Sequence, residues 1–415
     1  MHKKSFATTI LLLFSLLLSL TVRAELVIRI TDGVKDGVPV IIAPFEGGDL
    51  ASIVEADLAR SGRFTLIDSL RAGPLQMGQV IPREILRDTG AEYIVTGREA
   101  GGLEFEIITV ATGQRAASFR IPPHPSPRRM AHKAADLIFE RLTGIKGAFD
   151  TRIAYIASFG PPQGQTYQLV VADADGFNPR TVLSSGKPIM SPSWSPDGRQ
   201  LAYVSFETGQ SAIYIQDLVS GSKRVLTQEP GMNGAPAWSP DGSRIALSLS
   251  EGGNADIYVI NTSGTGLRQI TNSRAIETEP AWANANTIVY TSDQGGSPQL
   301  YRTSVAGGNG NRMTFSGRYN SAPSIVGNTV AMVSGDGNRF HIALMNASSR
   351  QVNAISRGGV DESPVLAPNG AMVLYATRTG GREILVVASA NGKARQTLTA
   401  PVGDVRDPAW SPYLN

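Results

Sequence analysis

Short apolar stretches separated by polar turns recur along the chain from about residue 150 onward. Six of them share one pattern, at residues 153–155, 201–203, 245–247, 288–290, 330–332 and 372–374. Further strand-like runs lie between them, such as residues 212–216, and Gly, Asn, Asp and Ser punctuate the gaps as tight turns require. The pattern predicts many short β-strands connected by turns.

A second marker repeats with the same period. Trp194, Trp238 and Trp282 are 44 residues apart, and Ile325, Leu366 and Trp410 continue the series at spacings of 43, 41 and 44. A proline lies two residues before each of these positions. A period of roughly 40–45 residues with four short strands per unit is typical of propeller blades. Stacked hairpins or a sandwich are the alternative.

The two marker series are out of phase at their ends. The first apolar stretch, at residues 153–155, has no tryptophan marker before it, and Trp410 has no apolar stretch after it. Bringing the C-terminal strand round to the first blade completes six blades and pairs two otherwise open sheet edges. We therefore expect a six-bladed propeller over residues 146–415, closed by the C-terminal strand, with the tryptophans as packing residues.

Residues 25–145 lack this period. An apolar run at residues 38–45 predicts a buried strand, Asp49 a helix start, and Ser61-Gly62 its end. Pro82 opens a short helix, and Ser126-Pro127 begins a longer one that Gly144 ends. Strands alternate with these helices, which predicts a small α/β domain. The fold class is thus multidomain: α/β followed by all-β.

Residues 1–24 have the layout of a secretory signal peptide. Lys3 and Lys4 precede an apolar run at residues 10–20, and the expected cleavage site follows Ala24. The run is short for a membrane anchor, the alternative reading. Without this segment, 35 basic residues face 35 acidic ones, so charge does not indicate a nucleic-acid partner. The absence of cysteine excludes thiol chemistry and cysteine-ligated zinc.

Motifs for catalysis or metal binding do not emerge from the sequence. There is no Gly-x-Ser-x-Gly elbow, and His124, His132 and His341 are scattered over two domains with no triad or zinc spacing. Asp173-Ala174-Asp175-Gly176 resembles the head of a calcium loop, but Ser184 stands where its twelfth-position acid should be. A turn is the better interpretation, and we predict no catalytic, cofactor-binding or metal-binding residue.

A protein-binding role has better support. In a propeller, the loops from each outermost strand to the next innermost strand share one face; here they are residues 187–191, 230–235, 275–279, 319–322, 358–363 and 403–407. Two methionines and several mixed polar groups in these loops suit adaptable protein contacts. The alternative is that they are solvated turns.

The chain resembles the TolB family, the periplasmic propellers of the Tol-Pal system in Gram-negative bacteria. The resemblance rests on residues 142–149 leading into 151–155, on Asn233-Gly234-Ala235-Pro236 and Thr278-Glu279-Pro280, on residues 367–370, and on the ending 408–414. It implies a non-enzymatic, monomeric periplasmic protein that supports outer-membrane invagination during cell division and envelope integrity. Colicins and phage proteins are further implied partners.

The resemblance also implies two binding sites. The lipoprotein Pal would bind the propeller face through Met190, Met232, Asn233, Gly234, Glu277, Thr278, Glu279, Asn320, Asp361, Glu362 and Arg406. TolA would bind the mature N-terminus through Glu25, Leu26, Val27, Ile28, Arg29, Ile30, Thr31 and Asp32. Met232 stands where relatives can carry a polar residue. Pal binding would change whether the N-terminal segment is free for TolA.

The residue pattern at the mature N-terminus also predicts a partner-binding segment, independently of the resemblance. Leu26, Ile28 and Ile30 alternate with Val27, Arg29 and Thr31, which predicts a strand able to add to a partner's sheet edge. An edge strand of the α/β domain is the alternative. For the whole chain, the alternative function is a periplasmic hydrolase or ligand-binding propeller with a site that no motif reveals.

Overall fold

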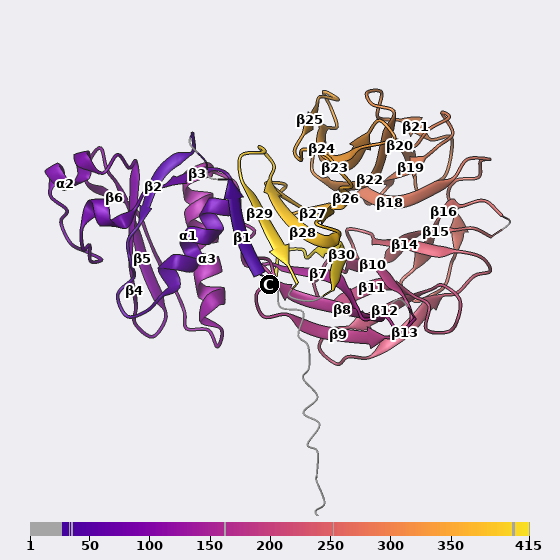
Figure 1. Ribbon diagram of the computed structural model, residues 1–415, viewed down its shortest axis with the longest axis horizontal. Coiled ribbons are helices and arrows are strands. Elements are labelled where there is room, and N and C mark those ends of the chain that lie inside the picture. The colour runs from indigo at the N-terminus through magenta and orange to yellow at the C-terminus, as the bar shows by residue number, and fades with distance from the viewer. Residues whose placement is uncertain are drawn as a thin grey trace, which may run out of the picture.

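The computed structural model describes residues 27–32, 34, 36–161, 163–251, 253–400 and 403–414. The expected signal peptide and the predicted contact residues Glu25 and Leu26 lie outside these ranges. An α/β domain and a propeller stand side by side (Figure 1). Among the described helices, none combines the length and apolar character that crossing a membrane requires.

The α/β domain is one mixed sheet with helices against it. Its sheet has the order β3-β2-β4-β5-β6, in which β2 pairs in parallel with β3 and β4 while the remaining pairs are antiparallel. The elements are β2 Val38–Ile42, α1 Leu50–Arg60, β3 Phe64–Leu66, the 3₁₀ helix η1 Ser69–Ala72, α2 Arg83–Asp88, β4 Tyr93–Glu99, β5 Leu103–Thr109, β6 Gln114–Ile121 and α3 Pro127–Thr143.

The two long helices form for the reasons that the sequence indicates. Leu50, Val54 and Leu58 recur on one face of α1 and are buried. Gly144 ends α3 in the left-handed region, at φ 73°, and its N–H donates to the Glu140 carbonyl. Asp49 occupies the N-cap position of α1, as predicted, but its side chain makes no capping bond. Glu99 instead accepts the Leu50 N–H at 3.2 Å from the end of β4.

The propeller has six blades of antiparallel strands. Blade 1 consists of β30 Asp404–Trp410, β7 Arg152–Phe159, β8 Thr166–Asp173 and β9 Arg180–Ser185; blade 2 of β10 Ile189–Trp194, β11 Gln200–Ser205, β12 Ala212–Asp217 and β13 Lys223–Thr227; and blade 3 of β14 Asn233–Trp238, β15 Arg244–Leu249, β16 Asp256–Asn261 and β17 Arg268–Gln269.

The remaining blades follow the same order from the inside outward. Blade 4 consists of β18 Glu277–Asn284, β19 Thr287–Ser292, β20 Gln299–Ser304 and β21 Asn311–Arg312; blade 5 of β22 Tyr319–Val326, β23 Thr329–Gly335, β24 Phe340–Asn346 and β25 Val352–Ala354; and blade 6 of β26 Glu362–Leu366, β27 Met372–Thr379, β28 Arg382–Ser389 and β29 Arg395–Thr399. The six-bladed propeller that the repeat predicts is confirmed.

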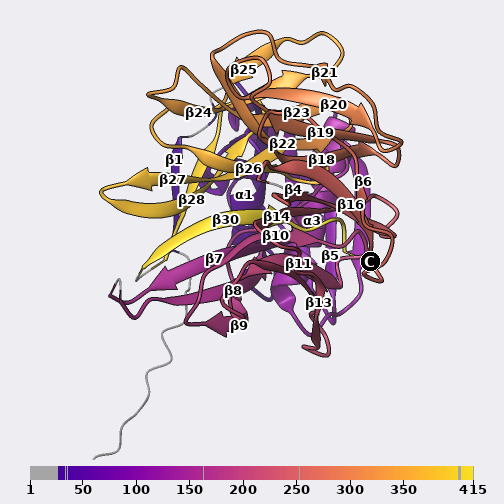
Figure 2. The same cartoon turned by 90° about the vertical axis from the view of Figure 1, so that its right-hand side faces the viewer.

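The C-terminal strand closes the ring, as predicted. β30 pairs with β7 from Asp404 opposite Ser158 to Trp410 opposite Ile153. The view from the propeller side shows the two strands running together, with the α/β domain behind the blades (Figure 2). Two hydrogen bonds between Arg152 and Ser411 extend this contact, at 2.9 and 2.8 Å. The first and last parts of the propeller therefore share one sheet.

The tryptophan markers are packing residues that also bind the neighbouring blade. The indole N–H of Trp194 donates to the Ala409 carbonyl, that of Trp238 to the Ser193 carbonyl and that of Trp282 to the Ala237 carbonyl, at 3.3, 3.2 and 2.9 Å. Each acceptor lies one residue before the marker of the preceding blade. The recurring tryptophan thus connects successive inner strands.

The N-terminal segment forms a strand, β1 Val27–Asp32, at the outer edge of blade 6. It runs antiparallel to β29, from Val27 opposite Thr399 to Asp32 opposite Arg395. In Figure 1 the indigo β1 lies beside the yellow β29. The alternative of an edge strand in the α/β domain is wrong, because the pairing partner belongs to the propeller. Nor is the segment free in this structure, since β29 occupies one of its edges.

Candidate functional site

The loops predicted to form a binding face connect each blade to the next. They are residues 186–188, 228–232, 270–276, 313–318, 355–361 and 400–403. Because the strands of each blade are antiparallel, all six loops emerge on one side of the propeller. We call these loops, with the first residues of the inner strands that follow them, the loop face. The inner strands gather about the middle of the propeller (Figure 1).

Each inner strand contains a bulge with a left-handed residue. These residues have φ between 47° and 54° and the strand register shifts at each; they are Ser191, Ala235, Glu279, Ala322, Ser363 and Asp407. A non-glycine residue in this region is strained by about 1–3 kcal/mol, and such strain concentrates at functional sites. The proline that follows each one is the marker read from the sequence. All six of these residues line the cavity between the inner strands.

The channel between the inner strands contains a cavity of about 460 Å³. Glu279 and Asp407 line it from two of the bulges. Glu279 Oε2 accepts the Thr291 hydroxyl and the Ala322 N–H, both at 2.8 Å, and Asp407 Oδ2 accepts the Ser191 N–H at 3.1 Å. Burial raises the pKa of both carboxyls, and these hydrogen bonds oppose the shift. Each acid therefore binds the bulge of the next blade.

Four of the predicted Pal-contact residues have buried side chains. Asn233, Glu277, Asn320 and Asp361 occupy the first or adjoining positions of their inner strands and are 3% exposed or less. Asn233 accepts the Glu229 N–H at 2.9 Å and donates to the Glu229 carbonyl at 2.7 Å. Asn320 donates to the Ser316 carbonyl at 2.8 Å.

Glu277 and Asp361, the two acids among these four residues, also accept hydrogen bonds from side chains of their own loops or blades. Glu277 accepts the Ser273 hydroxyl at 3.0 Å, and Asp361 accepts the hydroxyls of Ser356 and Thr377. Burial and these internal hydrogen bonds indicate that the four side chains hold the loops in shape from within, so we do not keep them in the proposed contact surface. Sequence alone could not separate them from their neighbours, because a buried and an exposed polar residue look the same in a loop.

The remaining predicted residues are accessible to different extents. Met232 is 45% exposed and Glu362 is exposed, while Gly234, Thr278, Glu279 and Arg406 are partly buried. Met190 packs partly against the core between blades 2 and 3. Arg406 Nη1 lies 3.8 Å from Glu383 Oε2. These residues form the reachable part of the predicted surface.

The contact surface predicted from the sequence omitted three exposed apolar residues of the loop face. Ile276 is 55% exposed, Phe315 is 61% exposed and Val360 is 52% exposed, each in a different loop. Together with Met232 they give four successive blades one large exposed apolar side chain each. The guanidinium groups of Arg312 and Arg350 pack over the ring of Phe315. Exposed apolar side chains in successive loops indicate a protein-interaction site. The available signal was an apolar residue inside an otherwise polar loop.

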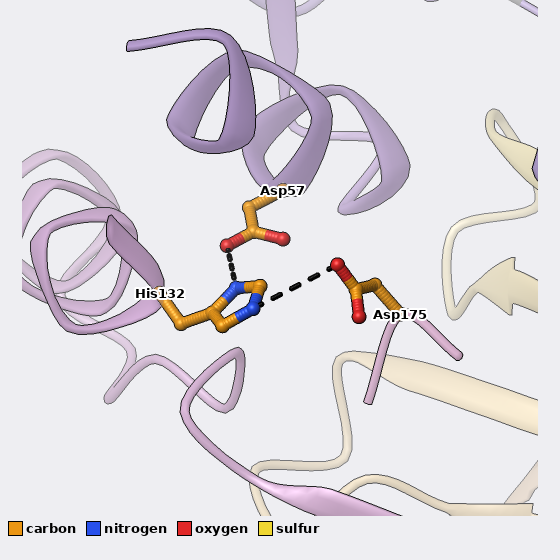
Figure 3. A group of neighbouring side chains, drawn as sticks. All are labelled: Asp57, His132 and Asp175. Carbon is orange, nitrogen blue, oxygen red and sulfur yellow. Dashed lines mark hydrogen bonds and ion pairs between the residues drawn. The ribbon is translucent and has the colours of Figure 1, made fainter. Parts of the chain in front are cut away.

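A second group of functional side chains lies where the α/β domain meets blade 1. His132 on α3 lies between Asp57 on α1 and Asp175 in the turn after β8 (Figure 3). Its Nδ1 is 2.7 Å from Asp57 Oδ2 and its Nε2 is 3.7 Å from Asp175 Oδ2. His132 and Asp57 are 2% and 1% exposed. We call this group the domain joint.

The domain joint was not predicted. The interpretation of residues 173–176 as a turn is confirmed, because the Gly176 N–H donates to the Asp173 carbonyl at 2.8 Å. Asp57 lies 75 residues before His132, and Asp175 lies 43 residues after it. No spacing motif within a short stretch of sequence could therefore have predicted the group. The three side chains are close enough together to hold a metal ion. However, Arg60 pairs with Asp57 and Arg128 with Asp175, and a cation would have to displace both guanidinium groups.

Comparison with known proteins covers both domains. Residues 139–414 match the TolB beta propeller domain, and residues 26–116 match the TolB amino-terminal domain. The chain is 45% identical to the Tol-Pal system protein TolB of Xanthomonas campestris pv. campestris (strain B100) and to that of Xanthomonas axonopodis pv. citri (strain 306), with 97% of each chain covered. A crystal structure of TolB from Acinetobacter baumannii is similar at 37% identity and TM-score 0.88, covering 94% of this chain and 100% of that one.

Proposed function

This chain belongs to the TolB family of Tol-Pal system proteins, and on that premise we propose that it is a non-enzymatic periplasmic adaptor. The lipoprotein Pal would bind its loop face, and TolA would bind the segment that begins the mature chain. Through these contacts the protein would support invagination of the outer membrane during division. The observation that carries the proposal is the loop face, where successive loops each expose one large apolar side chain beside inner strands with strained backbone.

The Pal surface is narrower in this proposal than the sequence indicated. We assign it to Met232, Thr278, Glu279 and Glu362, with the apolar side chains of Ile276, Phe315 and Val360 beside them. Apolar groups supply most of the affinity at such an interface, while polar groups fix its register. The buried side chains of the loops contribute indirectly, because they hold this arrangement.

Replacing both Thr278 and Glu279 by Ala should abolish capture of Pal, because both side chains are partly exposed near the start of the inner strand of blade 4. The loop should survive the change, since the Ala322 N–H also lies 3.1 Å from the Thr291 hydroxyl. We expect affinity to fall by at least about tenfold in a titration with purified Pal. Ile276→Ser should weaken binding in the same direction.

The matched control is Val219→Ser. Val219 is 80% exposed and lies in the turn between β12 and β13, which emerges on the opposite side of the propeller. It should bind Pal as the unmodified protein does. Undiminished capture by the Thr278/Glu279 variant would show that the loop face is misassigned. No capture by the unmodified protein would favour the alternative of a hydrolase or ligand-binding propeller.

Deleting residues 25–32 should abolish TolA binding while leaving the melting temperature almost unchanged. The deletion removes β1, which lies at the end of its sheet, and blade 6 keeps its four other strands. A pull-down with purified TolA measures the first effect and circular dichroism the second. Replacing the same segment by Gly and Ser residues controls for chain length and should bind no TolA either. Retention of TolA by either variant would rule out this segment as the site.

A further inference from the structure

The domain joint brings charged groups together from three separate elements. Helix α1 contributes Asp57 and Arg60, helix α3 contributes Arg128 and His132, and the turn after β8 contributes Asp175. The first element belongs to the α/β domain and the last to blade 1. The ring of His132 points one nitrogen toward each domain's carboxylate (Figure 3). The imidazole is thus one link between the two parts of the molecule, beside the ion pair of Arg128 with Asp175.

Only a protonated imidazole can donate an N–H to both carboxylates at once. A neutral ring carries one N–H, whereas the cation donates from both nitrogens. The contact to Asp57 is a hydrogen bond of 2.7 Å, and the contact to Asp175, at 3.7 Å, is within ion-pair range. Loss of one proton would leave Nε2 facing Asp175 with nothing to donate. The contact of His132 with the propeller would then weaken and leave Asp175 paired with Arg128 alone, while the contact with α1 remained.

Several buried polar atoms at the domain joint, including atoms of Arg60 and Arg128 that pair with it, lack hydrogen-bond partners. Nine buried side-chain nitrogen or oxygen atoms in the described residues have no hydrogen-bond partner, and five of them belong to Arg60, Arg128 and His132. Arg60 Nη2 and His132 Nε2 are still within ion-pair range of Asp57 and Asp175. Burying the remaining atoms without partners costs free energy, which hydration recovers when the joint opens. The closed joint therefore depends on its ion pairs more than a fully hydrogen-bonded interface would.

The N-terminal strand crosses the same boundary. β1 is hydrogen-bonded to β29 of the propeller, and the chain passes from its end at Asp32 to β2, which begins at Val38 in the α/β domain. This short connection means that a rotation of the α/β domain away from the blades must pull β1 along. One further bridge, from Asn391 Nδ2 to the Gly62 carbonyl at 2.7 Å, spans the domains near β29.

We propose that His132 is a proton-dependent latch: doubly protonated, it holds Asp57 and Asp175 together, and on losing a proton it releases Asp175, loosening the joint and the docking of β1 on β29. The latch itself follows from the contacts of the joint. Its consequence for TolA, which would gain access to the released segment, rests on the proposed function.

The direction of the pH response follows from the groups that face His132. Burial lowers the pKa of His132, but the charge and hydrogen bond of Asp57 and the charge of Asp175 outweigh it, and the pKa is raised overall. The proton therefore stabilises the closed joint fully below the unfolded value of about 6.5, and that stabilisation is lost as pH rises through the raised value. Arg60 opposes the proton, and Arg128 pairs with Asp175.

A neighbouring acid acts in the same direction. Asp136, one helical turn beyond His132, accepts the N–H groups of Phe149 and Asp150 at 2.6 and 3.3 Å. Burial raises its pKa to about 7 despite those bonds. Its ionisation in the folded protein therefore costs stability increasingly as pH rises toward 7. Both groups make the folded protein more stable in mild acid than above neutrality.

Amide hydrogen exchange of β1 and β29 in the full chain at pH 6 and pH 8 tests the latch. After correction for the intrinsic pH dependence of exchange, protection should fall by roughly threefold to tenfold at pH 8, as opening becomes more frequent. His132→Gln should show the low protection at both pH values. The control His124→Gln removes an exposed histidine that bonds only within residues 124–126 and should retain the normal response.

Asp175→Asn provides a second variant should His132→Gln fail to fold, and it too should show low protection at both pH values. Equal protection of the unmodified protein at pH 6 and 8 would overturn the proposal. So would a pH response of undiminished size in either variant, because Asp136 alone accounts for only part of it. None of these measurements involves TolA or Pal, so a failure of the latch is distinguishable from a failure of the proposed function.

Discussion

A chain that ends before Asp407 should lose the cooperative thermal transition of the intact protein. Truncation there removes the part of β30 that carries Ala409 and Trp410, whose side chains are buried and which pair with Ala154 and Ile153 of β7. Losing a buried tryptophan alone costs about 3–5 kcal/mol. Blade 1 and blade 2 would each also lose hydrogen bonds, since Trp410 donates to Thr151 and Trp194 donates to Ala409.

The expected loss is comparable to the whole stability of a typical domain, about 5–15 kcal/mol. Differential scanning calorimetry should therefore show a transition lowered by tens of degrees or absent. A chain ending at Ser411 is the control, because it keeps all of β30 and loses only the residues beyond it; its transition should fall by a few degrees. A truncated chain as heat-resistant as the intact one would disprove closure by the C-terminal strand.

Replacing Trp282 by Ala should lower the free energy of unfolding by about 3–5 kcal/mol. The side chain is 8% exposed in the core between blades 3 and 4, and its indole N–H donates to Ala237 at 2.9 Å. Truncation leaves a cavity and an unpaired carbonyl acceptor. Urea denaturation followed by fluorescence or circular dichroism measures the change.

Trp282→Ile is the informative comparison, because Ile325 occupies the equivalent position in blade 5. It keeps an apolar side chain but removes the indole donor, so its cost should be smaller than that of alanine. The difference between the two variants separates the contribution of packing from that of the hydrogen bond between blades. A loss below about 1 kcal/mol for Trp282→Ala would show that the tryptophans do not connect the blades.

The predicted contact residues illustrate how far a loop can be understood from its sequence. The repeat placed Asn320 and Thr278 on the same face of the propeller, although the structure puts both near the start of inner strands rather than in loops. Whether each side chain turns outward depends on partners such as Gln299 and Ser316, which accept from Asn320 inside the loop. Such partners are visible only when the strands are in place. The apolar residue Phe315 was overlooked for the converse reason, since an apolar side chain in a loop is expected to be buried.

The N-terminal strand was ambiguous for a different reason. Its alternation of side chains suits a free segment, an edge of the α/β sheet or an edge of a blade equally well. Pairing with β29 is decided by backbone groups that every strand carries, so no side chain identifies the partner.

The number of blades, the closing strand and the boundaries of α1 and α3 were determined by the sequence itself. These features depend on periodicity, turn residues and helix ends, which are properties of neighbouring residues along the chain. Only the tertiary structure decided the docking of β1, the burial of Asp361 and the meeting of Asp57, His132 and Asp175. Those contacts join segments far apart in the chain, and their geometry depends on the path of all the backbone between them.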